Sequence, residues 1–541
     1  MNGFKRIVLI WISAWSCLTL HAQTDSWTAV NERFKMQFAA GKYQEAQRSC
    51  DTALQLALRL HGKNHENYGK SLQNMGVLYF TLGDYPRAGN YFNEALIIRE
   101  SVHGINSTEA ISTLNNLAVL YKAQALNLKA EQTLAESRKR IEKGPGTASD
   151  VYARNLIISA SLAKQQSQYA MARAYLLEAL ENTRNRKGRL STAYADILND
   201  LAILAENLGE LRESSTYYTE AMGIVDSVQG QNNTTYARLL GNIGSVYKQL
   251  GQTKDAEDAL QRSIKLYKDF SADTNAAAAP LNNLGTLSLD LSRPLEALNC
   301  FQRAAAMYRN TRTAASAEYG MSLNNLGLAY KALGSYAEAL QYYQRALETR
   351  ESALGKGHPD VAATLNNMAI LYEDMNNHTL SLQYHVAAAE IRKTALGTTH
   401  PDYAASLYNR GRIHAQLKDY QQAITLYRQA LDIRLKVYGP NGLPVASTKE
   451  AMAGVLVNQS QYPEAEQLYL SVASVYRRSL GKFSEAHAMA MYNLSSLYTS
   501  WNKYDKAFLC FDSSFHLLDS LPHARKLHMQ CRAAYCGLRR R

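Results

Sequence analysis

Apolar residues recur with the spacing of amphipathic helices along nearly the whole chain. Residues 322–334, SLNNLGLAYKALG, show the pattern clearly, and their apolar spacing predicts a helix. The same stretch holds two adjacent asparagines, although asparagine costs a helix roughly 0.5 kcal/mol relative to alanine. This doublet occurs at the same place in several predicted helices, as Asn115-Asn116, Asn282-Asn283, Asn324-Asn325 and Asn366-Asn367.

A break follows each of these helices, and the breaks recur at a fixed interval. Every interval is 42 residues except one of 41. The break residue, termed the turn position here, occurs twelve times: Gly41, Gly83, Ala125, Ser167, Gly209, Gly251, Ser292, Gly334, Asn376, Lys418, Ser460 and Asn502. A fixed period of this length is typical of a solenoid built from repeated supersecondary units.

Small residues keep fixed distances from the turn position. Five residues after the turn, all twelve repeats have Ala or Ser. Seven residues before the turn, eleven repeats have Ala, Ser or Gly, and the exception is Phe34. Each repeat therefore predicts two closely packed helices: helix A ends at the turn, and helix B follows, for example at residues 336–354. Tyr330, Tyr342 and Tyr343 then have room to fill the space beside the close contact.

The links between repeats contain His-Pro-Asp at residues 358–360 and 400–402. Proline suits the first turn of a helix and aspartate favours a helix N-terminus. A neighbouring His and Asp also suggest catalysis, but the fixed repeat position favours helix capping.

Together these features resemble the 42-residue tetratricopeptide (TPR) repeats of kinesin light chains and their bacterial relatives. The shared pattern is L-N-N-L-[AG]-x-x-Y-x-x-x-G-x-Y-x-E-A, then A-L-x-x-R and L-G-x-x-H-P-D, and it covers residues 27–520. Residues 322–402, in repeats 8 and 9, match best; repeat 4, residues 155–196, departs most, with Ile157-Ile158 in place of the doublet. The resemblance implies an all-α fold, a right-handed α-solenoid of about twelve helix pairs with a concave groove.

The second asparagine of each doublet lies nine residues before the turn, two residues from the small residue that faces helix B. Two residues rotate a helix by about 200°, so this asparagine points away from helix B, towards the expected groove. Asp200, Ile158, Ala451 and Glu32 interrupt the series. The candidate peptide-binding residues are Asn74, Asn116, Asn242, Asn283, Asn325, Asn367, Asn409 and Asn493.

A second polar row continues the stripe seven residues further on. It contains Gln165, Asn207, Gln249, Asp290, Asp374, Gln416 and Asn458. An asparagine amide offers two donors and an acceptor, so it can pair with the N–H and C=O of an extended peptide. The resemblance implies the same role, because kinesin-light-chain-like repeats bind peptide backbone with groove asparagines. The alternative is that these amides only join successive helices.

The positive net charge changes the picture little. The formal excess is +12, but two positive charges lie in the first six residues and six in the last 22; without these eight it falls to +4. A nucleic-acid partner is therefore not expected. We expect a protein or peptide ligand in the groove, no cofactor and no metal; self-association is left open.

The N-terminal residues of the chain predict an exported protein. Residues 1–22 have the layout of a signal peptide, with a basic start, a 14-residue apolar core at residues 7–20 and Ala22 before the expected cleavage site. The predicted location is periplasmic or secreted, without strong membrane association after cleavage.

Residues 521–541 form a basic tail. A capping helix and a truncated end are both open interpretations of this tail.

No catalytic signature marks the chain as an enzyme. It lacks the P-loop, H-E-x-x-H, G-x-S-x-G and EF-hand patterns, and its five cysteines after the leader form neither a C-x-x-C pair nor a cluster with histidine. We expect a non-enzymatic interaction scaffold. The alternative is the sensing half of a TPR–effector system, with a CHAT-type protease or signalling kinase domain that is missing or on another chain.

Overall fold

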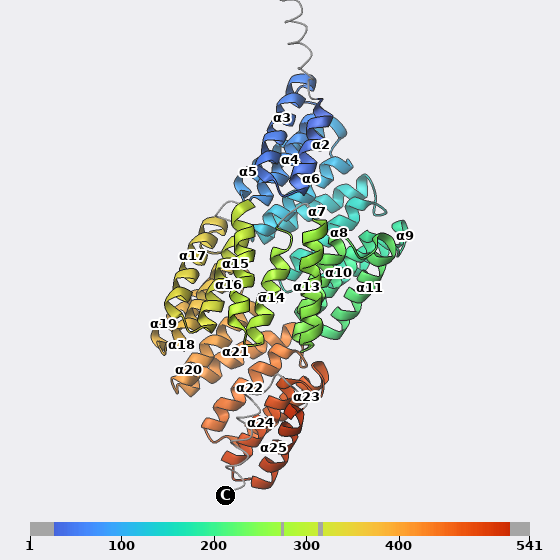
Figure 1. Cartoon of the computed structure of the whole chain (residues 1–541). Helices are drawn as coiled ribbons and strands as arrows, with labels where there is room; N and C mark the ends of the chain where they lie inside the picture. Colours follow the sequence, from blue (N-terminus) through green and yellow to red (C-terminus); the bar gives the residue numbers. More distant parts are fainter. Residues whose placement is uncertain (1–25, 272–274, 312–316, 520–541) are drawn as a thin grey trace, which may run out of the picture. The chain divides into compact units, whose positions relative to one another are not determined.

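The computed structural model describes residues 26–271, 275–311 and 317–519. The predicted leader and the basic tail lie outside these described residues. Within the described ranges the regular structure consists of 24 helices, which confirms the all-α solenoid of twelve helix pairs (Figure 1). The chain divides into two compact units, residues 1–113 and 114–541.

The first unit contains two complete helix pairs. Helix α6, which follows them, crosses the boundary between the units. The bounds are α2 (Trp27–Ala39), α3 (Tyr43–His61), α4 (Glu66–Thr81), α5 (Tyr85–His103) and α6 (Thr108–Ala123).

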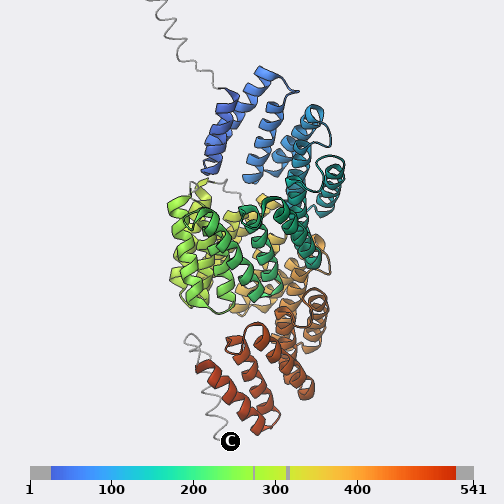
Figure 2. The ribbon, with the colours of Figure 1, turned by 90° about the vertical axis from the view of Figure 1, so that its right-hand side faces the viewer.

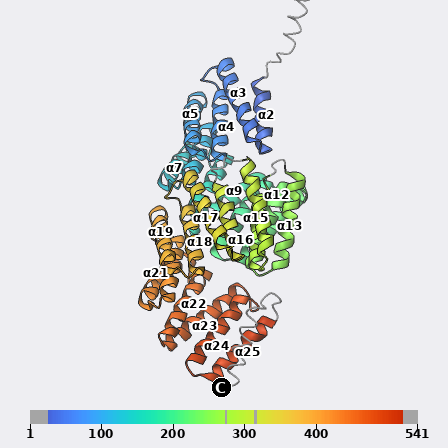
Figure 3. The same ribbon diagram turned by 60° about the vertical axis from the view of Figure 1, so that its left-hand side comes forward.

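The second unit continues the same alternation of A and B helices, and each A helix packs mainly against the B helix that follows it. Figures 1 and 3 show the pairs α16–α17 and α18–α19 following one another, and Figure 2 shows the last helices of the unit, coloured brown to red, from another side. The bounds are α7 (Asn127–Lys143), α8 (Asp150–Gln165), α9 (Tyr169–Lys187), α10 (Thr192–Leu208), α11 (Leu211–Gln229), α12 (Thr234–Gln249), α13 (Thr253–Phe270), α14 (Ala278–Asp290), α15 (Pro294–Thr311), α16 (Ala317–Ala332), α17 (Tyr336–Leu354), α18 (Pro359–Asp374), α19 (His378–Leu396), α20 (Pro401–Gln416), α21 (Tyr420–Tyr438), α22 (Leu443–Asn458), α23 (Tyr462–Ser479), α24 (Glu485–Ser500) and α25 (Tyr504–Asp519).

All twelve predicted turn positions have left-handed backbone conformation, with φ between 57° at Ala125 and 80° at Gly83. This conformation reverses the chain within a few residues and ends helix A. Five of the twelve are glycine, which adopts it without a steric penalty. Among the described residues, the seven non-glycine residues with positive φ are the other seven turn positions. The 42-residue period predicted from sequence therefore corresponds to a backbone geometry that repeats in every unit.

The small residues bring helices A and B into close contact, as predicted. The Ala or Ser five residues after each turn is fully buried in all twelve repeats. Before the turn, a Cβ atom added to Gly327 would lie 2.5 Å from the ring of Tyr343, which is itself fully buried. Glycine at this position thus provides the space that the aromatic ring occupies.

The His-Pro-Asp links are helix caps, and the histidine is the capping residue. The Nδ1 atoms of His358 and His400 accept hydrogen bonds of 3.2 and 3.0 Å from the N–H groups of Asp360 and Asp402. Proline occupies the first position of α18 and of α20. The capping interpretation is confirmed, and it accounts for the proximity of His and Asp without a catalytic role.

A buried arginine near the end of helix B joins several repeats to the next A helix. Arg350 donates from Nη1 to the carbonyl oxygen of Asp360 at 2.7 Å and to the hydroxyl of Thr364 at 2.8 Å. The equivalent residues Arg99, Arg392 and Arg434 make the same two kinds of contact. This arginine appears in the sequence pattern, but its role was not predicted.

Segments far apart in sequence meet within the second unit. The Nε2 atom of His400 lies 3.0 Å from the carbonyl oxygen of Gln165, and the rings of Tyr169 and Tyr438 lie 6.3 Å apart between centroids. The array therefore curves so that repeats five to six units apart are in contact. Among the described helices, none has the combination of length and apolar character needed to cross a membrane.

Candidate functional site

The A helices of successive repeats pack directly against one another. In the second unit this holds for α12 with α14, α14 with α16, α16 with α18, α20 with α22, and α22 with α24. We refer to the side of the A helices that faces away from the B helices as the inner face. The predicted asparagines lie on this face, because the glycine two residues further along contacts helix B at Gly327.

The second asparagine of a doublet bonds to the first asparagine of the preceding repeat. The two residues are 43 positions apart, which is one repeat plus one residue. In each bond the Nδ2 amide donates to the Oδ1 oxygen. The pairs are Asn74 with Asn31 at 2.8 Å, Asn242 with Asn199 at 2.8 Å, Asn325 with Asn282 at 3.2 Å, Asn367 with Asn324 at 2.9 Å, and Asn409 with Asn366 at 2.7 Å.

The remaining three candidates have other hydrogen-bond partners. Asn283 donates to the backbone oxygen of Gly241 at 3.4 Å, because glycine has no side chain to offer there. Asn493 donates to the carboxylate of Glu450 at 2.8 Å. Asn116 instead accepts from Arg154 at 3.1 Å. Six of the eight candidates thus donate to a side chain of the repeat before them, and Asn283 donates to its backbone.

The two members of a doublet differ in burial. The first asparagine is usually buried, with 5% exposed at Asn282 and 6% at Asn324. All eight second asparagines are only half-buried. The doublet therefore combines an inner acceptor with an outer donor, and this explains why two asparagines occur together in a helix. Sequence reasoning missed the role of the first asparagine, although the 43-residue offset was visible.

The half-buried amides keep hydrogen-bonding capacity beyond the inter-repeat bond. An asparagine side chain has two N–H donors and an oxygen with two lone pairs. Within the described residues, the bonds seen for these eight side chains each use one of these groups. The alternative role, joining successive helices, is therefore present in the structure, while part of each amide remains available on the inner face.

The second polar row also forms bonds between repeats. Gln249 donates to Glu206 at 2.5 Å, and Gln416 donates to Glu373 at 2.6 Å. Lys331 lies 3.0 Å from Asp374. Residues 165, 207, 290 and 458 complete the predicted row, in which Asp290 is 3.4 Å from Lys248.

A row of charged residues three positions before the turn was not predicted. It contains Lys122, Lys164, Glu206, Lys248, Lys331 and Glu373. Burial lowers the pKa of Lys122 and Lys164, and the nearby carboxylate of Asp200 opposes this shift. Burial raises the pKa of Asp200 and Glu206. The recurrence of lysine at one repeat position was the sequence signal for this row.

The inner face offers hydrogen-bonding groups and side chains of both charges. Among the described residues, no three His, Cys, Asp or Glu side chains form a group that could hold a metal ion. Cys50 and Cys300 are buried and Cys510 is half-buried in their helices. The arrangement suits a ligand that presents backbone amides and carbonyls.

Three solved structures similar to this chain differ in how much of it they cover. BtubC (BKLC) from P. vanneervenii is 17% identical, covers 43% of this chain and 91% of its own, and has a TM-score of 0.36. A Rap protein complexed with Competence and Sporulation Factor is 14% identical, with 68% and 98% coverage and a TM-score of 0.48. A kinesin light chain from Podosopora anserina with nearly identical TPR-like repeats is 20% identical, with 37% and 95% coverage and a TM-score of 0.30.

No curated protein matches the chain significantly. The model of the tetratricopeptide repeat family matches most of it, at residues 35–101, 79–143, 193–269, 275–352, 318–385, 360–436 and 444–519. Residues 144–192, which include most of repeat 4, fall between these matches. With the 42-residue period, the helix pairs and these matches in agreement, the chain belongs to the tetratricopeptide repeat family.

Proposed function

We propose that this protein is an exported, non-enzymatic scaffold that holds an extended segment of a partner protein along its inner face. Proteins of the tetratricopeptide repeat family are in general non-catalytic scaffolds for protein–protein interaction. The observation that supports the finer proposal is the row of half-buried amides, present in eight of the twelve repeats, with bonding capacity left on the inner face. Regular spacing suits a ligand with a regular backbone.

The amides would pair with the partner's backbone, so affinity would depend little on its side chains. Hydrogen bonds between the partner's main chain and an ordered row of donors and acceptors give affinity, while neighbouring pockets for its side chains give specificity. The mixed charges of Lys122, Lys164 and Glu206 would supply such specificity near repeats 3 to 5.

The proposal of export rests on residues 1–22. N-terminal sequencing of the mature chain tests it, since cleavage after Ala22 leaves Gln23 as the first residue.

The test uses two matched triple variants of the full chain. The first replaces Asn283, Asn325 and Asn367 by alanine and removes amides on the inner face. The control replaces Asn282, Asn324 and Asn366 by alanine; it removes the acceptors of three inter-repeat bonds but leaves the outer amides in place. Each lost bond costs about 1 kcal/mol of stability in either variant.

Peptides selected from a random library against the native chain serve as probes, and calorimetry gives their Kd. We expect the first variant to weaken binding about tenfold or more, on the basis of about 1.4 kcal/mol lost in ligand contacts. The control variant should stay within about threefold of the native chain at matched helical content. Equal affinities for both variants would show that the amides serve only the solenoid.

A further inference from the structure

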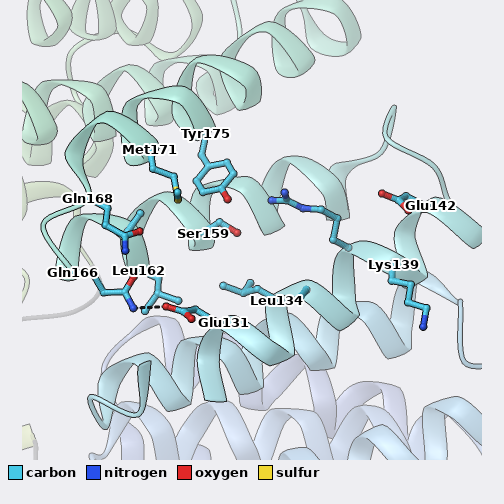
Figure 4. A pocket seen from close by; sticks show the side chains of 13 residues that line it. Glu131, Leu134, Lys139, Glu142, Ser159, Leu162, Gln166, Gln168, Met171 and Tyr175 are labelled. Atoms are coloured by element: carbon cyan, nitrogen blue, oxygen red, sulfur yellow. Dashed lines mark hydrogen bonds between the residues drawn. The ribbon is translucent and has the colours of Figure 1, made fainter. Parts of the chain in front are cut away.

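A cavity of about 510 Å³, separate from the row of amides, lies where repeat 4 meets helix α7 of repeat 3. It lies between helices α7, α8 and α9 (Figure 4). In the figure, Tyr175 and Met171 lie on one side of the hollow, Leu134 on the other, and Ser159 between them. The volume falls within the usual range of small-molecule sites, about 300–1,000 Å³.

The cavity exists because repeat 4 has small side chains at two positions where other repeats have large ones. Eight residues before the turn, repeat 4 has Ser159, whereas nine of the other eleven repeats have Leu, Ile or Met. Four residues before the turn it has Ala163, whereas six other repeats have tyrosine. The cavity therefore occupies the space that one aliphatic and one phenol side chain fill in other repeats.

The missing tyrosine leaves an aromatic wall without its usual partner. In repeats 8 and 9, the tyrosine at Ala163's position stacks on the tyrosine at Tyr175's position. The rings of Tyr330 and Tyr342 lie 5.1 Å apart with 11° between planes, and Tyr372 and Tyr384 lie 5.3 Å apart with 13°. Tyr175 occupies the same repeat position but faces Ala163, so a planar ring could stack where the phenol is absent.

Repeat 7 also lacks the tyrosine but keeps the aliphatic residue. There Ser288 replaces it, but Leu284 keeps the aliphatic position, and the equivalent hollow has only about 250 Å³. Its wall carries Cys300 where repeat 4 has Tyr175. Compared with repeat 7, the larger volume and the aromatic wall in repeat 4 thus come from Ser159 and Tyr175.

A positive charge lies beside the aromatic wall. The guanidinium carbon of Arg138 is 5.2 Å from the centroid of the Tyr175 ring, and Arg138 also lines the cavity. Guanidinium groups favour carboxylates, which they bind through paired N–H donors. The floor is apolar, with Leu134 5% exposed and Leu162 3% exposed.

We infer that this cavity binds a small planar aromatic acid. The ring stacks on Tyr175 in the place of the missing tyrosine, the apolar floor covers its edge, and the carboxylate meets Arg138. Access is from the rim, where Met171 is 48% exposed. The site is independent of the proposed peptide-binding amides.

Two probes test the inference on the full chain. The first, p-cresol, is the side chain of the missing tyrosine; the second, 4-hydroxyphenylacetate, adds a carboxylate. Calorimetry should show that both bind at millimolar concentration or below, the acid about tenfold more tightly because of the charged hydrogen bond. Arg138→Gln should remove this tenfold preference and leave p-cresol unchanged.

Filling the cavity provides the decisive variants. Ala163→Tyr and, separately, Ser159→Leu restore the residues of other repeats, so each should raise the midpoint of thermal unfolding and weaken both probes more than tenfold. Ser288→Tyr, the matched change in repeat 7, should leave their binding unchanged. Absence of binding by both probes, or binding that Ala163→Tyr does not weaken, would overturn the inference. Library peptides for the inner face should bind the filled variants normally, which separates the two proposals.

Discussion

Repeats 8 and 9 and repeat 4 show two uses of the same 42-residue unit. In repeats 8 and 9, the amide doublets join neighbouring A helices and tyrosine pairs fill the space between A and B helices. In repeat 4, Ile157 and Ile158 replace the doublet. The side chains of Asn155 and Arg154 bond to Asn115 and Asn116 instead.

The difference shows which positions the solenoid requires and which it leaves free. Repeat 4 keeps the left-handed turn at Ser167 and the fully buried Ala172, and its helix pair forms normally. It loses the side chains that fill the A–B junction, and a cavity results. The backbone geometry therefore depends on a few small residues, while the filling of each junction can vary from one repeat to the next.

The largest effect should come from adding bulk at the close contact before the turn. Gly327→Val forces a branched side chain against the buried ring of Tyr343 and should cost about 3 kcal/mol of stability. The matched change in repeat 4, Ala160→Val, has Leu176 in place of the ring and should cost about 1 kcal/mol.

Urea unfolding of both variants, followed by circular dichroism, measures the two costs. Because each repeat packs mainly against its neighbours, the array can unfold in steps, and the first transition is the quantity to compare. If Ala160→Val costs as much as Gly327→Val, the junction of repeat 4 is as tightly filled as that of repeat 8, and the comparison fails.

A smaller effect should appear on acidification, through His385 in repeat 9. This residue occupies the position of Tyr343 and is fully buried, and neither ring nitrogen has a hydrogen-bond partner within the described residues. Burial, with the nearby charges of Arg412, Arg392 and Arg410, lowers its pKa from 6.5 to about 4.

Since the folded-state pKa lies below the unfolded value, the contribution to stability is complete above pH 6.5 and is lost as the pH falls towards 4. We expect a loss of about 1 kcal/mol between about pH 7 and pH 5.5. His385→Leu introduces the residue that repeat 4 has at this position, Leu176, and should remove this part of the pH dependence. A variant with an unchanged pH profile would exclude His385 as its source.

Most of the fold could be predicted from the sequence because the solenoid depends on local, repeated requirements. Helix α17 has the predicted bounds, Tyr336–Leu354, and the twelve turn positions all have the expected break in the helix. The contact between Gln165 and His400 could not be predicted. It joins residues more than five repeats apart, and it depends on how small rotations accumulate along the array.

The candidate site could be predicted only in part. The direction of the second asparagine followed from helix geometry, and the half-buried positions agree with it. The bond to the preceding repeat depends on the offset between neighbouring A helices, which the sequence pattern does not state directly. The cavity of repeat 4 was missed because it results from two small residues, Ser159 and Ala163, and no motif marks it.

Site-specific photo-cross-linking tests most directly whether the inner face holds the partner. A photoreactive residue is placed at Asp374, exposed on the inner face of repeat 9, and in a second variant at Glu390, exposed on helix B of the same repeat. With a peptide selected on the native chain, we predict cross-links from Asp374 and few from Glu390. Equal yields, or cross-links mainly from Glu390, would contradict the account.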